Sequence, residues 1–213
     1  MQPSSHILEI DNLTFERNNQ IVLNEIQSTL HSGEILQIQG ANGSGKSTLL
    51  RILAGLIEPQ AGTVFWNRRC IFQQREEYHP HFHYLGHQNG NKLALTVQEN
   101  LHLAAALNKH RVDVSYIKHI LKKMGLTHAA HLLTLKLSAG QSRRLALAKL
   151  LLQERSLWIL DEPNTALDSE GQALLGRLLH DHLHHGGMAV IATHQPLSIS
   201  YEVKSIQLGD ARG

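Results

Sequence analysis

The sequence predicts an α/β fold in which a mixed sheet is flanked by helices, with an antiparallel β subdomain near the N-terminus and an inserted α-helical subdomain. Toward the end of the chain, short apolar strands alternate with helical segments, and the first forty residues resemble a meander of short strands. Between these parts, residues from about 95 to 137 carry helical patterns alone. Buried apolar strands separated by helices are typical of a parallel sheet with helices on both faces.

The N-terminal strands are marked by alternating apolar residues and by turn-forming residues. Arg17 to Gln20 indicate a turn, and the Ser-Gly pair at 32–33 ends the meander. A helix follows the glycine-rich loop and ends at Gly55. The elements expected in this part are strands at 6–11, 13–17, 21–23 and 34–39 and a helix at 47–54.

The rest of the chain continues with helices and then returns to alternating helices and strands. The expected elements are helices at 97–107, 114–124, 141–153 and 171–185 and strands at 82–87, 157–160 and 188–193. We therefore interpret residues 1–213 as one domain. Residues 1–94 and 138–213 are expected to form its core with the β subdomain, and about 95–137 the helical insert.

Composition excludes several classes of protein. Hydrophobic residues make up 42% of the 213 residues, which is enough to bury a core. Twenty basic and 18 acidic residues leave a net charge of +2, which is too small to indicate a nucleic-acid partner. The single cysteine, Cys70, excludes an internal disulfide. We expect neither a membrane span nor a signal peptide, because no apolar run approaches about 18 residues and the start lacks a basic region before an apolar one.

A phosphate-binding loop is predicted at residues 40–47, which fit G-x-x-x-x-G-K-[ST] between a strand and a helix. Its glycines let backbone N–H groups surround an anion, and the helix N-terminus adds partial positive charge. Lys46 is expected to reach the β- and γ-phosphates of ATP, and the Ser47 hydroxyl to bind Mg²⁺. The alternative is a glycine-rich turn that fits the motif by chance, and the Lys-Ser pair at 46–47 disfavours it. The predicted nucleotide-binding residues are Gly40, Ala41, Asn42, Gly43, Ser44, Gly45, Lys46, Ser47 and Thr48.

Two acidic residues end the apolar strand at 157–160. Ligands of open α/β sheets lie at the carboxyl ends of strands, so Asp161 is predicted to hold Mg²⁺ through water. The neighbouring Glu162 is predicted to orient and deprotonate the water that attacks the γ-phosphate. The alternative is a strand end with solvated acids, and the phosphate-binding loop earlier in the chain disfavours it.

Further segments resemble the ATP-binding subunits of ATP-binding-cassette (ABC) transporters. Leu137-Ser138-Ala139-Gly140-Gln141 resembles their signature motif, residues 164–168 resemble their D-loop, Gln88 resembles their Q-loop glutamine and His194 their switch histidine. The motifs occur in the order of that family and cover nearly the whole chain. The fold that the resemblance implies is a P-loop NTPase with an ABC-ATPase core.

The resemblance also implies how these residues act. Ser138, Gly140 and Gln141, just before or at the start of the helix predicted at 141–153, would face the γ-phosphate of ATP held by a second cassette subunit in a head-to-tail homodimer. Asp168 of the D-loop would lie at the same nucleotide, and Gln88 would contact Mg²⁺ or the attacking water. His194 would bind the γ-phosphate and hold Glu162; the alternative for His194 is a core histidine at a strand end.

The resemblance has two departures. Ala139 replaces the usual glycine of the signature motif. At the position where the family usually places an aromatic ring under adenine, this chain has Arg17, whose guanidinium can stack on a base. Phe15, two residues earlier on the same face of the strand, is the alternative adenine contact.

Short sequence segments resemble one branch of the family, the ATP-binding subunits of haem exporters that serve cytochrome c maturation. They lie at 85–92, 95–101, 157–163 and 193–197, and Arg17 and Ala139 fit the same branch. The resemblance implies a peripheral place on the cytoplasmic face of a bacterial inner membrane, a small multi-span permease partner, and haem delivery or release of a haem chaperone. The alternatives are the ATPase of another exporter, a cassette protein acting on ribosomes or DNA, and a nucleotide-binding regulator without turnover.

Histidine is unusually frequent, with 16 residues. Two clusters contain His79, His81 and His83, and His180, His182, His184 and His185. Imidazole can bind metal ions or haem iron, but a solvated polar face is the simpler interpretation, because no cysteine or carboxylate set accompanies the clusters at ligand spacing.

Overall fold

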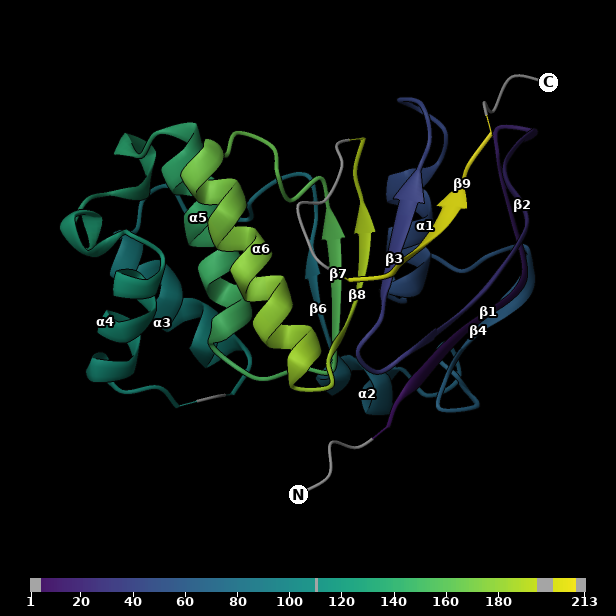
Figure 1. Ribbon diagram of the computed structural model, residues 1–213, viewed down its shortest axis with the longest axis horizontal. Helices are drawn as coiled ribbons and strands as arrows, with labels where there is room; N and C mark the ends of the chain where they lie inside the picture. The colour runs from purple at the N-terminus through teal and green to yellow at the C-terminus, as the bar shows by residue number, and fades with distance from the viewer. Residues whose placement is uncertain (1–4, 110, 195–200, 210–213) are drawn as a thin grey trace. The chain divides into compact units, whose positions relative to one another are not determined.

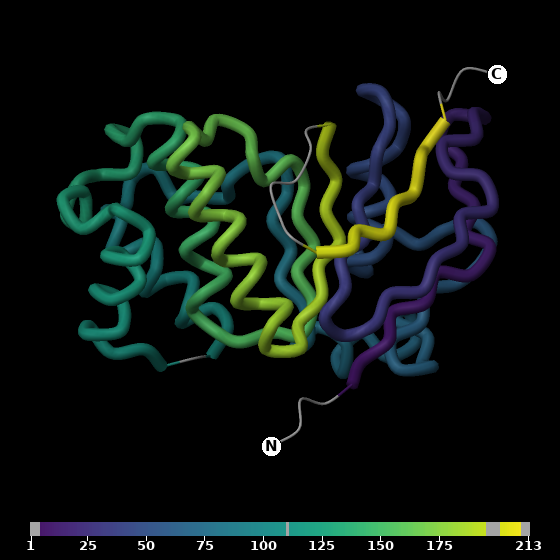
Figure 2. Tube along the Cα trace, viewed as in Figure 1, coloured from purple at the N-terminus to yellow at the C-terminus, as the bar shows by residue number. Residues whose placement is uncertain are grey.

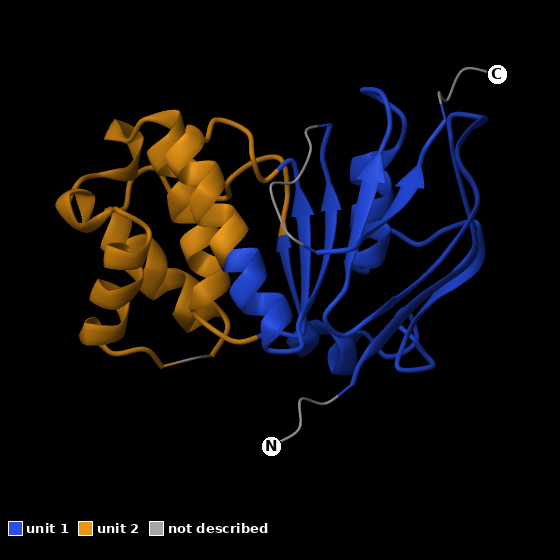
Figure 3. Cartoon of the chain, viewed as in Figure 1, with its two compact units in different colours: residues 1–84, 155–162, 178–213 blue, residues 85–154, 163–177 orange. Residues whose placement is uncertain are grey.

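The computed structural model describes residues 5–109, 111–194 and 201–209. The chain divides into two compact units, shown in Figure 3. Unit 1 comprises Met1–Tyr84, Arg155–Glu162 and Leu178–Gly213, and unit 2 comprises Leu85–Glu154 and Pro163–Arg177. The expected insert at 95–137 lies within unit 2, which also contains the signature segment, residues 137–141.

Unit 1 contains a four-stranded sheet in the order β2-β1-β4-β5. Its strands are β1 (Ile7–Arg17), β2 (Gln20–His31), β4 (Ala61–Trp66) and β5 (Arg69–Cys70), and each neighbouring pair is antiparallel. Figure 2 shows β1 and β2 running side by side.

Two predictions for this sheet need correction. Residues 6–11 and 13–17 form one strand, because Asn12 takes a positive φ of 46° in a bulge that shifts the register between Ile10 and Leu13. β2 extends to His31, far beyond the predicted 21–23. Its second half alternates half-buried and exposed residues around polar side chains, which conceals the strand in the sequence.

The second sheet has five strands in the order β6-β7-β8-β3-β9 (Figure 1). They are β3 (Ile35–Gln39), β6 (Phe82–Leu85), β7 (Leu157–Asp161), β8 (Met188–Ala192) and β9 (Val203–Gln207). The pairs β7/β8, β8/β3 and β3/β9 are parallel. Every residue of β7 and β8 is buried, as expected for strands covered on both faces.

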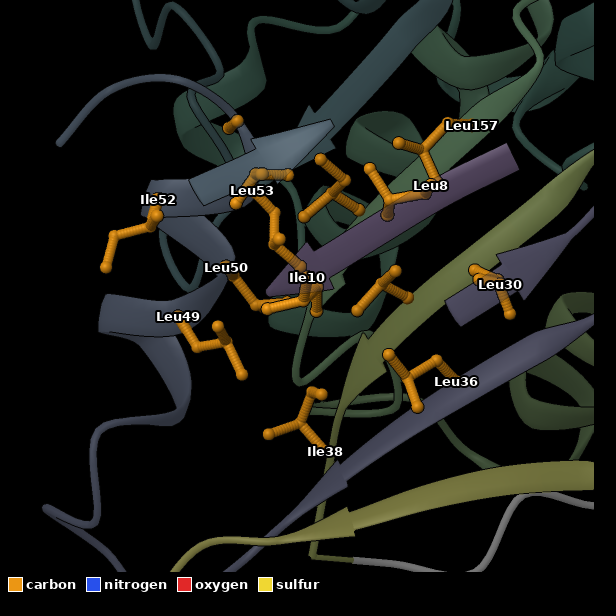
Figure 4. Packing of buried hydrophobic residues seen from close by; sticks show 14 of the residues in the cluster. Leu8, Ile10, Leu30, Leu36, Ile38, Leu49, Leu50, Ile52, Leu53 and Leu157 are labelled. Atoms are coloured by element: carbon orange, nitrogen blue, oxygen red, sulfur yellow. The ribbon is translucent and has the colours of Figure 1, made fainter. Parts of the chain in front are cut away.

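The hydrophobic core of unit 1 joins the two sheets through helix α1 (Lys46–Leu53). Leu49, Leu50, Ile52 and Leu53 recur at helical spacing and are fully buried. Figure 4 shows them around β1 and β3, with Ile10 beside Leu50. Because α1 packs on β7 and β8, the start of this helix is fixed beside the carboxyl ends of those strands.

Unit 2 is helical. Its helices are α3 (Val97–Leu107), α4 (Val114–Lys123), α5 (Ala139–Ala148) and the first part of α6 (Ser169–His184). Thr96 caps α3 in a capping box with Glu99, and the Asp113 side chain caps α4. These caps explain why both helices begin where the sequence predicts.

The helix predicted at 141–153 is shorter and starts earlier. Ser138 caps it, so that α5 begins at Ala139, and it tightens into a 3₁₀ turn at Lys149–Leu151. The sequence did not predict four elements: the short helix α2 (Arg75–Tyr78) and the strands β4, β5 and β9. Across the described ranges 5–109, 111–194 and 201–209, no helix combines the length and the apolarity needed to cross a bilayer.

Candidate nucleotide site

Three sequence features meet at one edge of the parallel sheet in unit 1. The phosphate-binding loop follows β3, Asp161 and Glu162 end or follow β7, and His194 follows β8. These strands are neighbours in the order β7-β8-β3, and Ala192 of β8 lies opposite both Asp161 and Ile38 in the register. Since parallel strands end at a common edge, the loop, the acids and the histidine converge there.

The phosphate-binding loop depends on its glycines. Gly40, Gly43 and Gly45 have positive φ angles of 150°, 88° and 97°, which other residues rarely adopt. A Cβ on Gly40 would collide with the Ser44 hydroxyl, and one on Gly45 would lie 2.8 Å from Cγ1 of Val22. Gly45 provides no capping side chain for α1, so the positive end of this helix is presented to an anion in the loop.

Lys46 already points into the loop. Its side chain is buried in the loop, and Nζ donates hydrogen bonds to the carbonyl oxygens of Gly40 (2.8 Å) and Ala41 (2.9 Å). The ammonium group is therefore held by backbone at the anion site rather than extended into solvent. In this position a bound phosphate group can replace the two carbonyls as the hydrogen-bond acceptor of Nζ.

Glu162 and His194 form a pair at the strand ends. His194 Nδ1 lies 3.1 Å from Oε1 and 3.0 Å from Oε2 of Glu162. The Glu162 N–H also donates to the carbonyl of Ala192 at 2.8 Å, and its φ of 46° is in the left-handed region. Such a backbone costs about 1–3 kcal/mol in a non-glycine residue and is typical of functional sites. The Glu162 carboxylate is only 14% exposed, whereas the His194 ring is 59% exposed.

The oxygen donors at this edge fit a magnesium ion. Ser47 lies in the first turn of α1, and the buried Asp161 ends β7, which packs beside that helix. Mg²⁺ favours one or two carboxylate or hydroxyl oxygens together with phosphate oxygens and water. Within the part of the chain that the structure describes, no cluster of three or more histidine, cysteine or acidic side chains is arranged to hold a metal alone.

The β1–β2 hairpin reaches the loop, since Val22 of β2 lies against Gly45. Of the two adenine candidates on β1, Phe15 packs against the hydrophobic core, while Arg17 is exposed at the end of the strand. Arg17 is thus more exposed than Phe15.

The signature segment lies in unit 2 and forms the start of α5. Ser138 and Gln141 cap each other: Ser138 Oγ accepts from the Gln141 N–H at 3.2 Å, and Gln141 Oε1 accepts from the Ser138 N–H at 3.0 Å. Gly140, expected before the helix, lies in its first turn. A Cβ there would approach the Ala166 carbonyl to 3.0 Å, so this glycine lets the D-loop, residues 164–168, pass close to the helix.

Asp168 has a local structural role. Its carboxylate accepts from the Gly171 N–H at 2.8 Å and from Arg144 at 2.9 Å, and these bonds lower the Asp168 pKa. It thereby caps α6 and ties the D-loop to α5. Gln88 is exposed in the segment that follows β6, also in unit 2. The sequence did not point to Arg144, because an arginine in an amphipathic helix gives no signal of its partner.

The histidine clusters are not simply solvated. His81 stands among the rings of Trp66 and His6, and His182 stacks on Trp158 at 4.1 Å with an interplanar angle of 9°. Burial lowers the His182 pKa to about 4. His180 and His184 do share one face of α6, as their spacing predicts, with ring centroids 6.1 Å apart. The interpretation as a polar solvated face is therefore wrong for His182.

Comparisons with known proteins match this architecture. The ABC transporter family matches residues 23–165. Proteins named cytochrome c biogenesis ATP-binding export protein CcmA are 42% identical over 97% of this chain in Vibrio cholerae, covering 100% of that protein, and 40% identical over 97% in Escherichia coli K12, covering 98%.

Solved structures resemble the fold. One described as the structure of the ATP-binding subunit of an ABC transporter has a TM-score of 0.79 and 26% identity over 88% of this chain and 79% of its own. A putative ABC transporter ATP-binding protein from Pyrococcus furiosus has a TM-score of 0.78 over 95% of this chain and 97% of its own, and at 24% identity it supports the fold alone. The chain therefore belongs to the ABC transporter family, as an ATP-binding subunit that hydrolyses ATP and works with a membrane permease.

Proposed function

We propose that ATP is hydrolysed at the edge formed by β3, β7 and β8, with Glu162 as the base. The observation that carries this proposal is the Glu162–His194 pair, at 3.0–3.1 Å, on the strand ends next to the phosphate-binding loop. The carboxylate orients and deprotonates the attacking water, and His194 holds the carboxylate and contacts the γ-phosphate.

Lys46 and the loop bind the phosphates. The backbone N–H groups of residues 40–48 surround them, and Nζ of Lys46 turns from its carbonyl partners to the β- and γ-phosphates. Ser47 and Asp161, with Gln88, would hold Mg²⁺, which when bound neutralises negative charge on the phosphate oxygens. Arg17 stacks on the adenine. These groups act mainly by positioning and by charge.

The signature segment serves a second ATP. Ser138, Gly140 and Gln141 form the N-terminal turn of α5, which is a place for an anion. In a head-to-tail homodimer this turn and the D-loop with Asp168 complete the ATP site of the partner subunit. One chain thus supplies two halves of different sites, and hydrolysis requires two copies.

The export function that we favour is haem export or delivery for cytochrome c maturation. Its support is the similarity over nearly the whole chain to proteins named cytochrome c biogenesis ATP-binding export protein. In this role the protein lies on the cytoplasmic face of the bacterial inner membrane, bound to a small multi-span permease, and no nucleic acid takes part. Another exporter substrate is the second candidate.

The assignment of the base is tested by Glu162→Gln. We expect ATP turnover to fall roughly 100-fold or more while nucleotide binding stays within about threefold, because only the proton acceptor is removed. Glu76→Gln, an exposed acid on α2, is the matched control and is expected to hydrolyse ATP like the parent. A Glu162→Gln variant that turns over at the parental rate would show that another group is the base.

The export role is tested by complementation. In a bacterium that lacks its own cytochrome c maturation ATP-binding subunit, co-expression of this chain with the cytochrome c maturation permease of its own organism is expected to restore covalently haem-loaded c-type cytochromes. The Glu162→Gln variant is expected to fail. Active ATPase without restored cytochromes would favour another exporter.

A further inference from the structure

Arg143 of α5 is buried and contacts two functional segments of unit 2. It lies two residues after the signature segment, and only 2% of it is exposed. Its Nη1 donates to the carbonyl of Gly86 at 3.3 Å and to Oδ1 of Asn89 at 2.9 Å, on either side of Gln88. Its Nε donates to the carbonyl of Pro163 at 3.3 Å. Pro163 directly follows Glu162 in the chain.

The same helix holds the rest of the segment after β6, residues 86–92. The Ser142 hydroxyl accepts from the side-chain amides of Asn89 (3.1 Å) and Asn91 (3.0 Å), and the Ser142 carbonyl accepts from Asn91 at 2.9 Å. Lys149 Nζ donates to the Gly90 carbonyl at 3.1 Å. Burial and the nearby Lys92 lower the Lys149 pKa to about 8.

The far end of the segment is fixed separately. Asn100 of α3 accepts from the Lys92 N–H at 2.8 Å and donates to the Lys92 carbonyl at 3.0 Å and the Thr134 hydroxyl at 2.9 Å. The segment that carries Gln88 is therefore anchored by α5 at one end and by α3 at the other. Arg143 is the side chain that also reaches the backbone beyond Glu162.

We propose that Arg143 is a positioning residue for ATP hydrolysis, which sets Gln88 and the backbone leaving Glu162 relative to the signature helix. A guanidinium with donors in a planar fork suits this role, because it can bridge carbonyls that lie in different directions. The proposal rests on the proposed roles of Glu162 and Gln88. Because the proposed role acts through Gln88 and the backbone after Glu162 and not through the phosphate-binding loop, nucleotide affinity is expected to be insensitive to Arg143.

The structural role of Arg143 is tested by hydrogen exchange, without an activity measurement. In the full-length chain, Arg143→Met removes the donors but keeps much of the apolar stem. We expect the amides of residues 86–92 to exchange hydrogen roughly tenfold faster than in the parent, while the α1 amides exchange at the parental rate. Asn89→Ala, which removes the Arg143 bond at Asn89 and the Asn89–Ser142 bond but leaves the Arg143 bonds to Gly86 and Pro163, is expected to give a smaller acceleration. Unchanged exchange over 86–92 in Arg143→Met would overturn the proposal.

The role of Arg143 in hydrolysis is tested by measuring ATP turnover. The rate is expressed per nucleotide-binding site, and the sites are counted by titration so that misfolded molecules are excluded. We expect kcat to fall roughly tenfold or more in Arg143→Met with KM for ATP within about threefold, because displacements of about 1 Å reduce rates strongly. Arg143→Lys, which keeps the charge, is expected to fall between Met and the parent. A kcat within twofold of the parent, or a loss of ATP affinity as large as the loss of kcat/KM, would overturn it. A parent-like Glu162→Gln would instead refute the proposed base while the exchange result still stands.

Discussion

Acidification is expected to destabilise unit 1 through His182. This ring stacks on Trp158, and one of its nitrogens, Nε2, lies 3.0 Å from the Met188 carbonyl. A Cβ on Gly187 would overlap the imidazole, so the turn before β8 packs directly on it. Burial holds the His182 pKa at about 4, against the ordinary value of 6.5, and the neighbouring His83 and His185 act in the same direction although the Met188 bond opposes it.

The size and the pH window follow from this pKa. Well above pH 6.5 the ring is neutral in both the folded and the unfolded chain, so its contribution to stability does not change there. Between pH 6.5 and 4 the unfolded chain takes up a proton that the folded chain refuses, and the free energy of unfolding falls. Linkage gives a loss of about 2 kcal/mol between pH 8 and pH 5 and about 3 kcal/mol when both states are protonated.

The assay is urea unfolding at pH 8, 7, 6 and 5, followed by the fluorescence of the two tryptophans, Trp66 and Trp158. His182→Gln keeps a hydrogen-bond donor near Met188 but cannot titrate, so its free energy of unfolding is expected to decline by about 2 kcal/mol less than that of the parent over this range. His184→Gln, an exposed histidine on the same helix, is the control and is expected to follow the parent. Parallel declines in the parent and in His182→Gln would refute the view that the folded protein holds this ring neutral.

Two further substitutions test the phosphate-binding loop and the signature segment. Gly45→Ala is expected to weaken ATP binding at least about tenfold in a fluorescent-nucleotide titration, because alanine resists a φ of 97° and its Cβ would press on Val22; binding at parental affinity would contradict the described loop. Ser138→Ala is expected to cost about 1 kcal/mol in urea unfolding, since it removes the cap of α5, whereas Ser138→Thr should keep most of it; equal stabilities of both variants would show that the cap is not made.

The sequence was most informative where chemistry is local. Residues 40–47 and the acids at 161–162 lie on strand ends because their flanking apolar runs require it, and the parallel sheet then brings them to one edge. Long-range contacts could not be foreseen in this way. An arginine at 143 and a histidine at 182 indicate exposed helix faces; contacts with residues distant in the sequence, such as the Pro163 carbonyl and the Trp158 ring, leave Arg143 buried and His182 partly buried. β4 and β9 escaped prediction because each is short and only partly buried, without a strong apolar alternation.

The chain passes between its two units next to residues of the nucleotide site. One segment of unit 1 ends at Glu162, and the chain enters unit 2 at Pro163. The chain also passes from unit 1 to unit 2 between Tyr84 and Leu85, shortly before Gln88. The proposed base, Glu162, and Gln88, which is proposed to help hold Mg²⁺, thus lie close in the sequence to these links between the units. Arg143 donates to the carbonyl of Pro163, the first residue after the link at 162–163. It also donates to the carbonyl of Gly86, the second residue after the link at 84–85. Within unit 2, Arg143 therefore joins the two segments that follow these links, and its removal should alter turnover more than affinity.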